Sequence, residues 1–169
     1  MLKLSNKMML NKNHLVNAII IKLNQELKNA INSAEMARLA ATDDQSVAET
    51  QYDTLGLEAS YLAHGQSERA ELIKQQIKQY QNLLIKDFDE KDEIDIGCLV
   101  KLNNTLNNAE LFYFIGPSAG GLKIQLNDLK VMLITPQAPV AKELIGKFKF
   151  DLISLPGPKA NELEIVEIF

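Results

Sequence analysis

Residue types that commonly build cross-links and metal sites are scarce in this chain of 169 residues, which has one cysteine and two histidines. It also has no tryptophan. A single cysteine excludes a disulfide framework and a cysteine-built zinc site, and two histidines leave little material for a histidine-centred metal site. No apolar run approaches the roughly 18 residues of a membrane span. The N-terminus also lacks an apolar stretch of signal-peptide length. We therefore expect a soluble, cytoplasmic protein with no membrane partner.

Positive charge is missing from one long stretch of the chain. The net charge of -4 disfavours a generally basic nucleic-acid binder. Residues 39–68 contain no lysine or arginine. The acidic residues of this stretch are Asp43, Asp44, Glu49, Asp53, Glu58 and Glu68. Such a local excess attracts cations or basic surfaces, although the simpler interpretation is a solvated acidic face.

No proline precedes Pro117, so nothing before it forbids long helices. Two stretches follow the alternating spacing of a heptad seam, the second with one break of a stutter type around Gln66. The first comprises Val16, Ile20, Leu23, Leu27, Ala30, Ala34, Ala37 and Ala41. The second comprises Ala48, Tyr52, Leu55, Ala59, Leu62, Gln66, Ala70, Ile73, Ile77, Tyr80 and Leu84. We expect helices from about Asn13 to Ala41 and from about Val47 to Ile85, joined by a short turn and therefore antiparallel.

The first seam changes from large aliphatic residues at its base to alanine near the turn. Small residues let helix axes approach but bury little apolar area, at roughly 25 cal/mol per Å². Gly56 and Gly65 in the second helix each cost up to about 1 kcal/mol relative to alanine. The turn end should therefore be thin, acidic and weakly held, which indicates insertion into a narrow space.

Period-two patterning replaces the helical spacing after a charged linker at residues 86–93. Strands are expected at 98–102, 110–115, 122–126, 131–134 and 163–168, with one short helix at 140–145. The glycine-rich segment 116–121 lacks the ending of a phosphate-binding loop, so it is interpreted as a hairpin turn. The predicted class is α+β, with an antiparallel coiled-coil hairpin at residues 1–88 and a small, mostly antiparallel β domain at 89–169.

Residues 135–147 carry the most specific resemblance to a known family. Their sequence, Thr-Pro-Gln-Ala-Pro-Val-Ala-Lys-Glu-Leu-Ile-Gly-Lys, resembles the proline, short helix and closing Leu-x-Gly-Lys of the Gre family of bacterial transcript cleavage factors, GreA and GreB. Residues 46–61, 96–100 and 163–168 also resemble parts of that family. The resemblance implies an FKBP-like β domain that docks on RNA polymerase beside its secondary channel, and a hairpin that enters this channel.

The same resemblance suggests a role for the acidic tip. In cleaving members, tip carboxylates help to hold a second Mg²⁺ at the polymerase active site, and carboxylates suit this hard cation. The metal-facing candidates here are Asp43, Asp44 and Glu49. The family's glutamate three residues after an aspartate is not reproduced, because Ser46 and Val47 occupy those positions. The alternatives are turn and helix-dipole roles for the aspartates and a capping box for Glu49.

The leading hypothesis is therefore a transcription elongation factor that is not itself an enzyme. It would bind RNA polymerase core, contact nascent RNA only indirectly, hold no cofactor tightly and share Mg²⁺ with the polymerase. Two versions stay open, in which the hairpin either stimulates cleavage of backtracked RNA or blocks and tunes the channel without cleavage. A rival hypothesis is a coiled-coil interaction protein that self-associates as a homodimer. A third, an isomerase or chaperone, lacks the clustered aromatics of a prolyl-peptide pocket.

Overall fold

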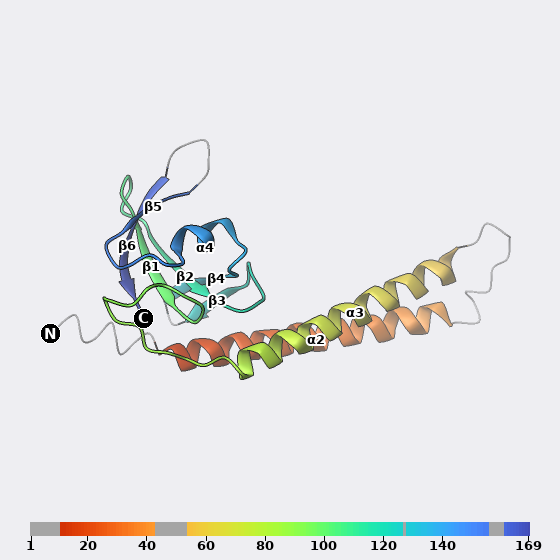
Figure 1. Ribbon diagram of the computed structural model, residues 1–169. Coiled ribbons are helices and arrows are strands. Elements are labelled where there is room, and N and C mark those ends of the chain that lie inside the picture. The colour runs from red at the N-terminus through yellow and green to blue at the C-terminus, as the bar shows by residue number, and fades with distance from the viewer. Residues whose placement is uncertain (1–10, 43–53, 127, 156–160) are drawn as a thin grey trace. The chain divides into compact units, whose positions relative to one another are not determined.

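The computed structural model describes residues 11–42, 54–126, 128–155 and 161–169 (Figure 1). Its helices are α2 (Lys12–Ala41), α3 (Leu55–Gln81) and α4 (Pro139–Leu144). Its strands are β1 (Leu99–Asn104), β2 (Glu110–Ile115), β3 (Lys123–Leu126), β4 (Leu129–Ile134), β5 (Leu152–Leu155) and β6 (Asn161–Ile168). The predicted α+β class, a helical hairpin followed by a β domain with one short helix, is confirmed.

Two compact units make up the chain. One contains residues 20–78, and the other contains the chain up to Ile19 together with residues 79–169. The base of each long helix thus belongs to the unit that contains the sheet. The domain division at residues 88 and 89 stays a prediction. Within the described ranges, neither long helix is apolar enough over a sufficient length to cross a membrane.

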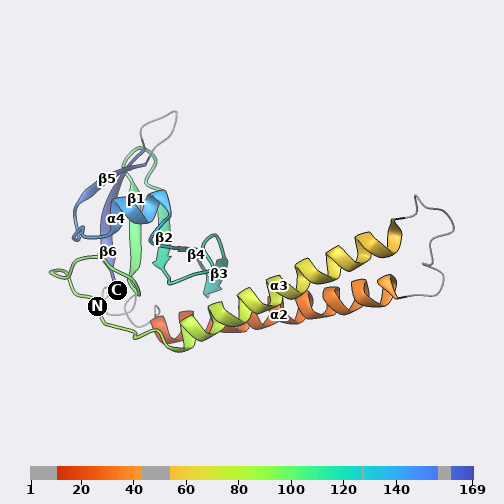
Figure 2. The ribbon, with the colours of Figure 1, turned by 45° about the vertical axis from the view of Figure 1, so that its right-hand side comes forward.

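Helices α2 and α3 run side by side in both ribbon views (Figures 1 and 2). Helix α2 begins one residue before the predicted start and ends at the predicted Ala41. Every member of its predicted seam is buried or half-buried, as expected for the apolar face of an amphipathic helix. The first seam is therefore confirmed.

Helix α3 is shorter than predicted at its C-terminal end. It ends at Gln81 rather than Ile85, and Leu84, which was placed in the second seam, is 89% exposed. The chain leaves the helix because Phe88 has to reach the core of the β unit, where it is 5% exposed. Thr54 before the helix is not helical, and the predicted helical residues 47–53 lie outside the described part of the chain.

Lys12 and Lys86 hold this connecting segment in place. The Lys12 ammonium donates a hydrogen bond to the Lys86 carbonyl and lies 4.7 Å from the centroid of the Phe88 ring. The Lys86 ammonium lies 5.0 Å from the same centroid, so two cations lie close to the ring. Lys12 is only 6% exposed, and this burial lowers its pKa. The segment interpreted as a charged linker is therefore fixed through an aromatic residue.

The sheet has six strands in the order β3-β4-β2-β1-β6-β5. Its neighbours are antiparallel except for β2 and β4, which are parallel with Phe112 opposite Val131. The prediction of a hairpin turn at 116–121 is wrong, because β2 and β3 do not pair. Gly116 and Gly121 instead donate backbone hydrogen bonds to Ile134 and Leu133, which tie this segment to the end of β4.

Helix α4 and the connecting segment contribute to one core of the β unit. Proline in the first turn starts α4, and Ala141 and Leu144 are fully buried against strand residues. The other members of this core are Phe88, Ile94, Cys98, Val100, Leu102, Ile115, Ile134, Ile153, Leu163, Ile165 and Ile168. Cys98 is therefore the small core residue that the sequence predicted.

Tyr80 and Gly116 approach each other closely inside the β unit. The Tyr80 hydroxyl donates a hydrogen bond of 2.7 Å to the Ser118 carbonyl, and a methyl group on Gly116 would overlap that hydroxyl. We expect Gly116→Ala to lower the free energy of unfolding by about 1–3 kcal/mol in urea titrations. Tyr80→Phe should cost about 1 kcal/mol by itself and should reduce the cost of Gly116→Ala. Additive costs would contradict the steric argument.

The Cys98 thiol should be chemically silent in the folded protein. It is fully buried, and burial raises its pKa to about 12. Because the thiolate is the reactive form, a thiol reagent at pH 8 should label Cys98 only after denaturation. Mass spectrometry of labelled native and urea-unfolded samples measures this directly. Rapid labelling of the native protein would show that the β unit opens more readily than its packing indicates.

Candidate functional site

The tip of the hairpin is the predicted site, and its candidate residues Asp43, Asp44 and Glu49 lie outside the described residues. Their roles therefore stay predictions. The structure describes the two arms that lead to the tip, from Ile20 in α2 and to Lys78 in α3. Within the described ranges, no cluster of three histidine, cysteine or acidic side chains could hold a metal ion. The described part of the candidate site therefore consists of the two arms.

Small residues form the inner face of α3 along the outer half of the hairpin. The half-buried residues of this face include Gly56, Ala59 and Ala63. The predicted second seam is wrong at Leu55 and Leu62, which are 68% and 56% exposed, and correct at Ala59. The reason lies in the opposite helix, whose seam at this end consists of alanine. Two small-residue faces can pack closely, whereas leucines between them would hold the helices apart.

Large apolar side chains point away from this narrow interface. The exposed apolar residues of the outer arms are Met36, Leu39, Leu55, Leu57, Tyr61 and Leu62, which are each 50–68% exposed. Single exposed apolar residues are ordinary, but several on two adjacent arms form an unusual surface for a soluble protein. The sequence does not predict this exposed apolar surface, because the heptad seam places Leu55 and Leu62 on the inner face. The outer arms therefore combine a small-residue inner face with an apolar outer surface.

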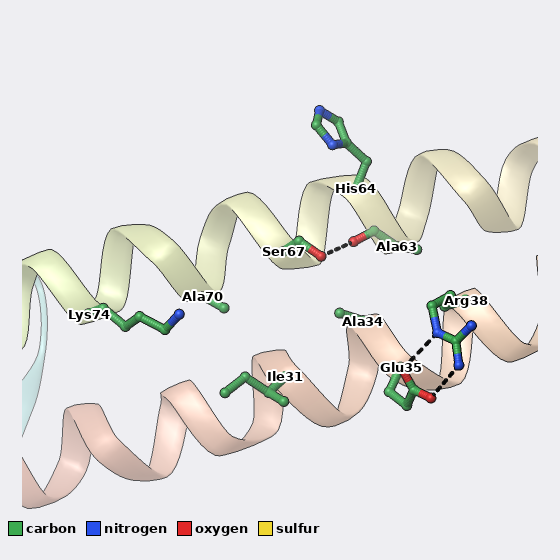
Figure 3. Close-up of a pocket in the computed structure, with 9 residues that line it drawn as sticks. All are labelled: Ile31, Ala34, Glu35, Arg38, Ala63, His64, Ser67, Ala70 and Lys74. Carbon is green, nitrogen blue, oxygen red and sulfur yellow. Dashed lines mark hydrogen bonds and ion pairs between the residues drawn. The ribbon is translucent and has the colours of Figure 1, made fainter.

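An open groove of about 390 Å³ runs between the two arms (Figure 3). Ala34, Ala63 and Ala70 project into the space between the helices, and their small size leaves it unfilled (Figure 3). One rim carries Glu35 and Arg38, which form two hydrogen bonds of 2.8 and 2.9 Å. These bonds lower the pKa of Glu35 and raise that of Arg38. Both side chains are more than half exposed, so this pair adds little stability.

Two acids of the lysine-free stretch lie in the described part of α3. The Glu58 carboxylate accepts a hydrogen bond of 2.7 Å from the Thr54 hydroxyl at the start of the helix, where an acid favours the helix dipole. Glu68 lies 3.5 Å from the His64 imidazole, and both are exposed. These contacts are local to one helix. Both acids are exposed, so these contacts leave the acidic character of the arm open to solvent.

Replacement of Gly65 by alanine should stabilise the hairpin. A Cβ at this position would meet no atom within 4 Å, and Gly65 lies inside α3. Alanine has the higher helix propensity, so Gly65→Ala should raise the free energy of unfolding by about 0.5–1 kcal/mol. The urea midpoint and helical circular dichroism measure the change. A loss of stability would mean that the position is less open than its surroundings indicate.

The narrow interface should reject a large residue. Ala37 is 6% exposed, whereas the adjacent Met36 is 68% exposed. We expect Ala37→Leu to lower the free energy of unfolding by about 1–3 kcal/mol because the helices must separate. Met36→Leu is the matched control and should change it by less than about 0.5 kcal/mol. Equal effects of the two substitutions in thermal unfolding would contradict a close small-residue interface.

Comparison with known proteins gives results at the level of structure alone. No protein-family model matches the chain, and no curated protein matches its sequence. The crystal structure of GreA factor homolog 1 (Gfh1) from Thermus thermophilus is 21% identical, with a TM-score of 0.38, over 89% of this chain and 94% of that chain. Gfh1 from Thermus aquaticus is 21% identical, with a TM-score of 0.38, over 88% and 90% of the two chains.

A further similar structure is the prokaryotic transcription elongation factor GreA/GreB from Nitrosomonas europaea. It is 18% identical and has a TM-score of 0.35, over 60% of this chain and 90% of that chain.

Proposed function

We propose that this chain is a Gre-type transcription factor that binds RNA polymerase core and acts through the polymerase active site. The observation that carries the proposal is the two-helix unit of residues 20–78, whose inner face becomes alanine and glycine toward an acidic connecting segment. The segment that resembles the family supports it, because Pro139 opens α4 and Gly146 follows the helix with a φ of 79°. The hairpin enters the secondary channel in this proposal.

The physical case rests on the dimensions and charge of the hairpin. At 1.5 Å per residue, the α2 arm from Ile20 to Ala41 extends about 33 Å, and a pair of helices with a small-residue interface is narrow. Acidic side chains at its end suit a cavity that holds Mg²⁺. Asp43, Asp44 and Glu49 would contribute ligands to a metal that belongs to the polymerase. The protein would then modulate a reaction without performing one.

Two modes of action follow from the tip. Carboxylates that reach the polymerase active site would stimulate cleavage of backtracked RNA by helping to hold the second metal ion. A hairpin whose carboxylates do not converge on that metal would occupy the channel and slow the polymerase instead. The spacing of Asp43, Asp44 and Glu49 keeps both modes under consideration, and a single assay separates them.

Binding to polymerase core is the first test of the proposal. The immobilised protein should retain purified bacterial RNA polymerase core at micromolar concentration. A variant in which a short linker replaces the hairpin residues 20–78 should compete poorly with the wild type for the channel. Sedimentation of the free protein serves as the control for the rival hypothesis, since the exposed apolar arms favour self-association. Absence of core binding together with a concentration-dependent dimer would establish the homodimer instead.

Transcript shortening in backtracked complexes tests the mode of action. If the tip stimulates cleavage, Asp43→Asn, Asp44→Asn and Glu49→Gln should each slow shortening by about tenfold or more, which corresponds to the loss of about 1.4 kcal/mol of transition-state stabilisation. Glu68→Gln is the matched control, since Glu68 is an exposed acid of the same stretch that pairs with His64. Core binding without shortening, accompanied by slower elongation, would identify the channel-tuning mode.

A further inference from the structure

The sheet face that packs against α4 is only partly covered. Helix α4 contacts β5, which is the edge strand at the other side of the sheet from β3. Val100 and Leu102 of β1 are fully buried in the core that α4 shares. Tyr113 and Leu111 of β2 lie opposite them and are half-buried, as is Met132 of β4 opposite Tyr113. Apolar side chains toward the β3 edge therefore keep surface that the fold does not cover.

An open pocket of about 310 Å³ lies over these strands. Its lining includes Leu111, Tyr113 and Met132 together with Lys123 and Lys130. Lys123 of β3 lies opposite Met132, and Lys130 of β4 is level with Leu111 in the parallel register. Each lysine thus continues a row of apolar side chains toward the edge of the sheet. Apolar walls, a few polar groups and a volume of about 300–1,000 Å³ are typical of small-molecule sites.

The charge of this pocket is positive. Among the described residues, no acidic side chain forms an ion pair with Lys123 or Lys130. Glu110 also lines the pocket, but its carboxylate lies 2.7 Å from the Lys101 ammonium. The other acid in residues 110–134 is Asp128, which is exposed in the turn between β3 and β4. Positive charge beside an apolar surface is complementary to an anion that carries an apolar body.

The Tyr113 hydroxyl adds a hydrogen-bond donor to the pocket. Burial raises its pKa, so the hydroxyl stays protonated at neutral pH. Within the described part of the chain, no group accepts a hydrogen bond from it. Tyrosine hydroxyls usually find a partner when they are buried. An oxygen atom of a ligand would supply the acceptor that the protein does not.

We propose that this pocket binds a small organic anion. Its apolar body would lie on Leu111, Tyr113 and Met132, and its carboxylate, sulfonate or phosphate group would lie near Lys123 and Lys130. The inference goes beyond the proposed function, because the site belongs to the β unit and needs no polymerase. A ligand that binds only the folded β unit would also stabilise that unit.

Anilinonaphthalene sulfonate tests the site, because it joins an aromatic body to one sulfonate group. Isotope-labelled methionine methyl groups locate the binding by nuclear magnetic resonance, with Met132→Leu to assign the signal of Met132. That signal should shift saturably below about 1 mM probe, which corresponds to binding of about 4 kcal/mol. Met36 is 68% exposed on the hairpin and reports in the same spectrum on the apolar arms.

Two charge-removing variants test the anion. Lys123→Met and Lys130→Met keep an apolar stem, so each should weaken binding of the sulfonate by about fivefold or more. Phenylnaphthylamine is the same aromatic body without the sulfonate, and its binding should change by less than about twofold. Lys91→Met is the matched control, since Lys91 is an exposed lysine outside the pocket.

The remaining outcomes would overturn the inference. A shift of the Met36 signal without one of Met132 would place the probe on the hairpin. Equal losses for the charged and the neutral compound would show an apolar surface without preference for anions, as would an equal effect of Lys91→Met. A dimer in sedimentation that the probe dissociates would assign the pocket to a second copy of this chain. None of these outcomes decides binding to polymerase core, so the proposed function stands or fails separately.

Discussion

Small side chains on the facing sides of α2 and α3 govern the hairpin unit. Ala30 and Ala37 of α2 are buried at 4% and 6% exposure, and Ala70 of α3 is buried at 6%. Because these residues are small, they fill little of the space between the helices, and a groove stays open there. Large apolar residues such as Tyr61 and Leu62 are instead exposed on the outer side of the helices. A slender shape and an apolar exterior thus have one common cause.

The β unit follows a different principle, in which individual contacts fix segments that carry no regular structure. Two lysine ammonium groups lie close to the Phe88 ring, which holds the connection after α3. Tyr80 occupies the space beside Gly116 and binds the Ser118 carbonyl, which holds the connection between β2 and β3. Both connections looked like solvated linkers or turns in the sequence. Their aromatic residues and glycines are what give them defined positions.

Local patterns in the sequence predicted the fold class, the first seam and most strands, because helical and strand periods leave distinct spacings of apolar residues. The parallel pairing of β2 with β4 depends on residues distant in sequence. The local sequence of segment 116–121 therefore predicts a hairpin turn that the structure does not contain. Leu55 and Leu62 fit a heptad as well as Gly56 and Ala63 do, and the alanines of α2 decide between them. The positive φ of Phe150 cannot be predicted from the amino-acid composition. The roles predicted for the tip residues stay predictions.

The side chains buried along the hairpin become smaller from its base to its outer half. Leu23, Ile73 and Ile77 are at most 8% exposed, whereas the outer half is joined by alanine and glycine. Backbone amides there are protected by helical hydrogen bonds alone, and local opening should require far less energy than global unfolding. Hydrogen exchange would therefore be graded along each arm. Such mechanical compliance allows the outer turns to adjust to their surroundings while the base keeps its shape.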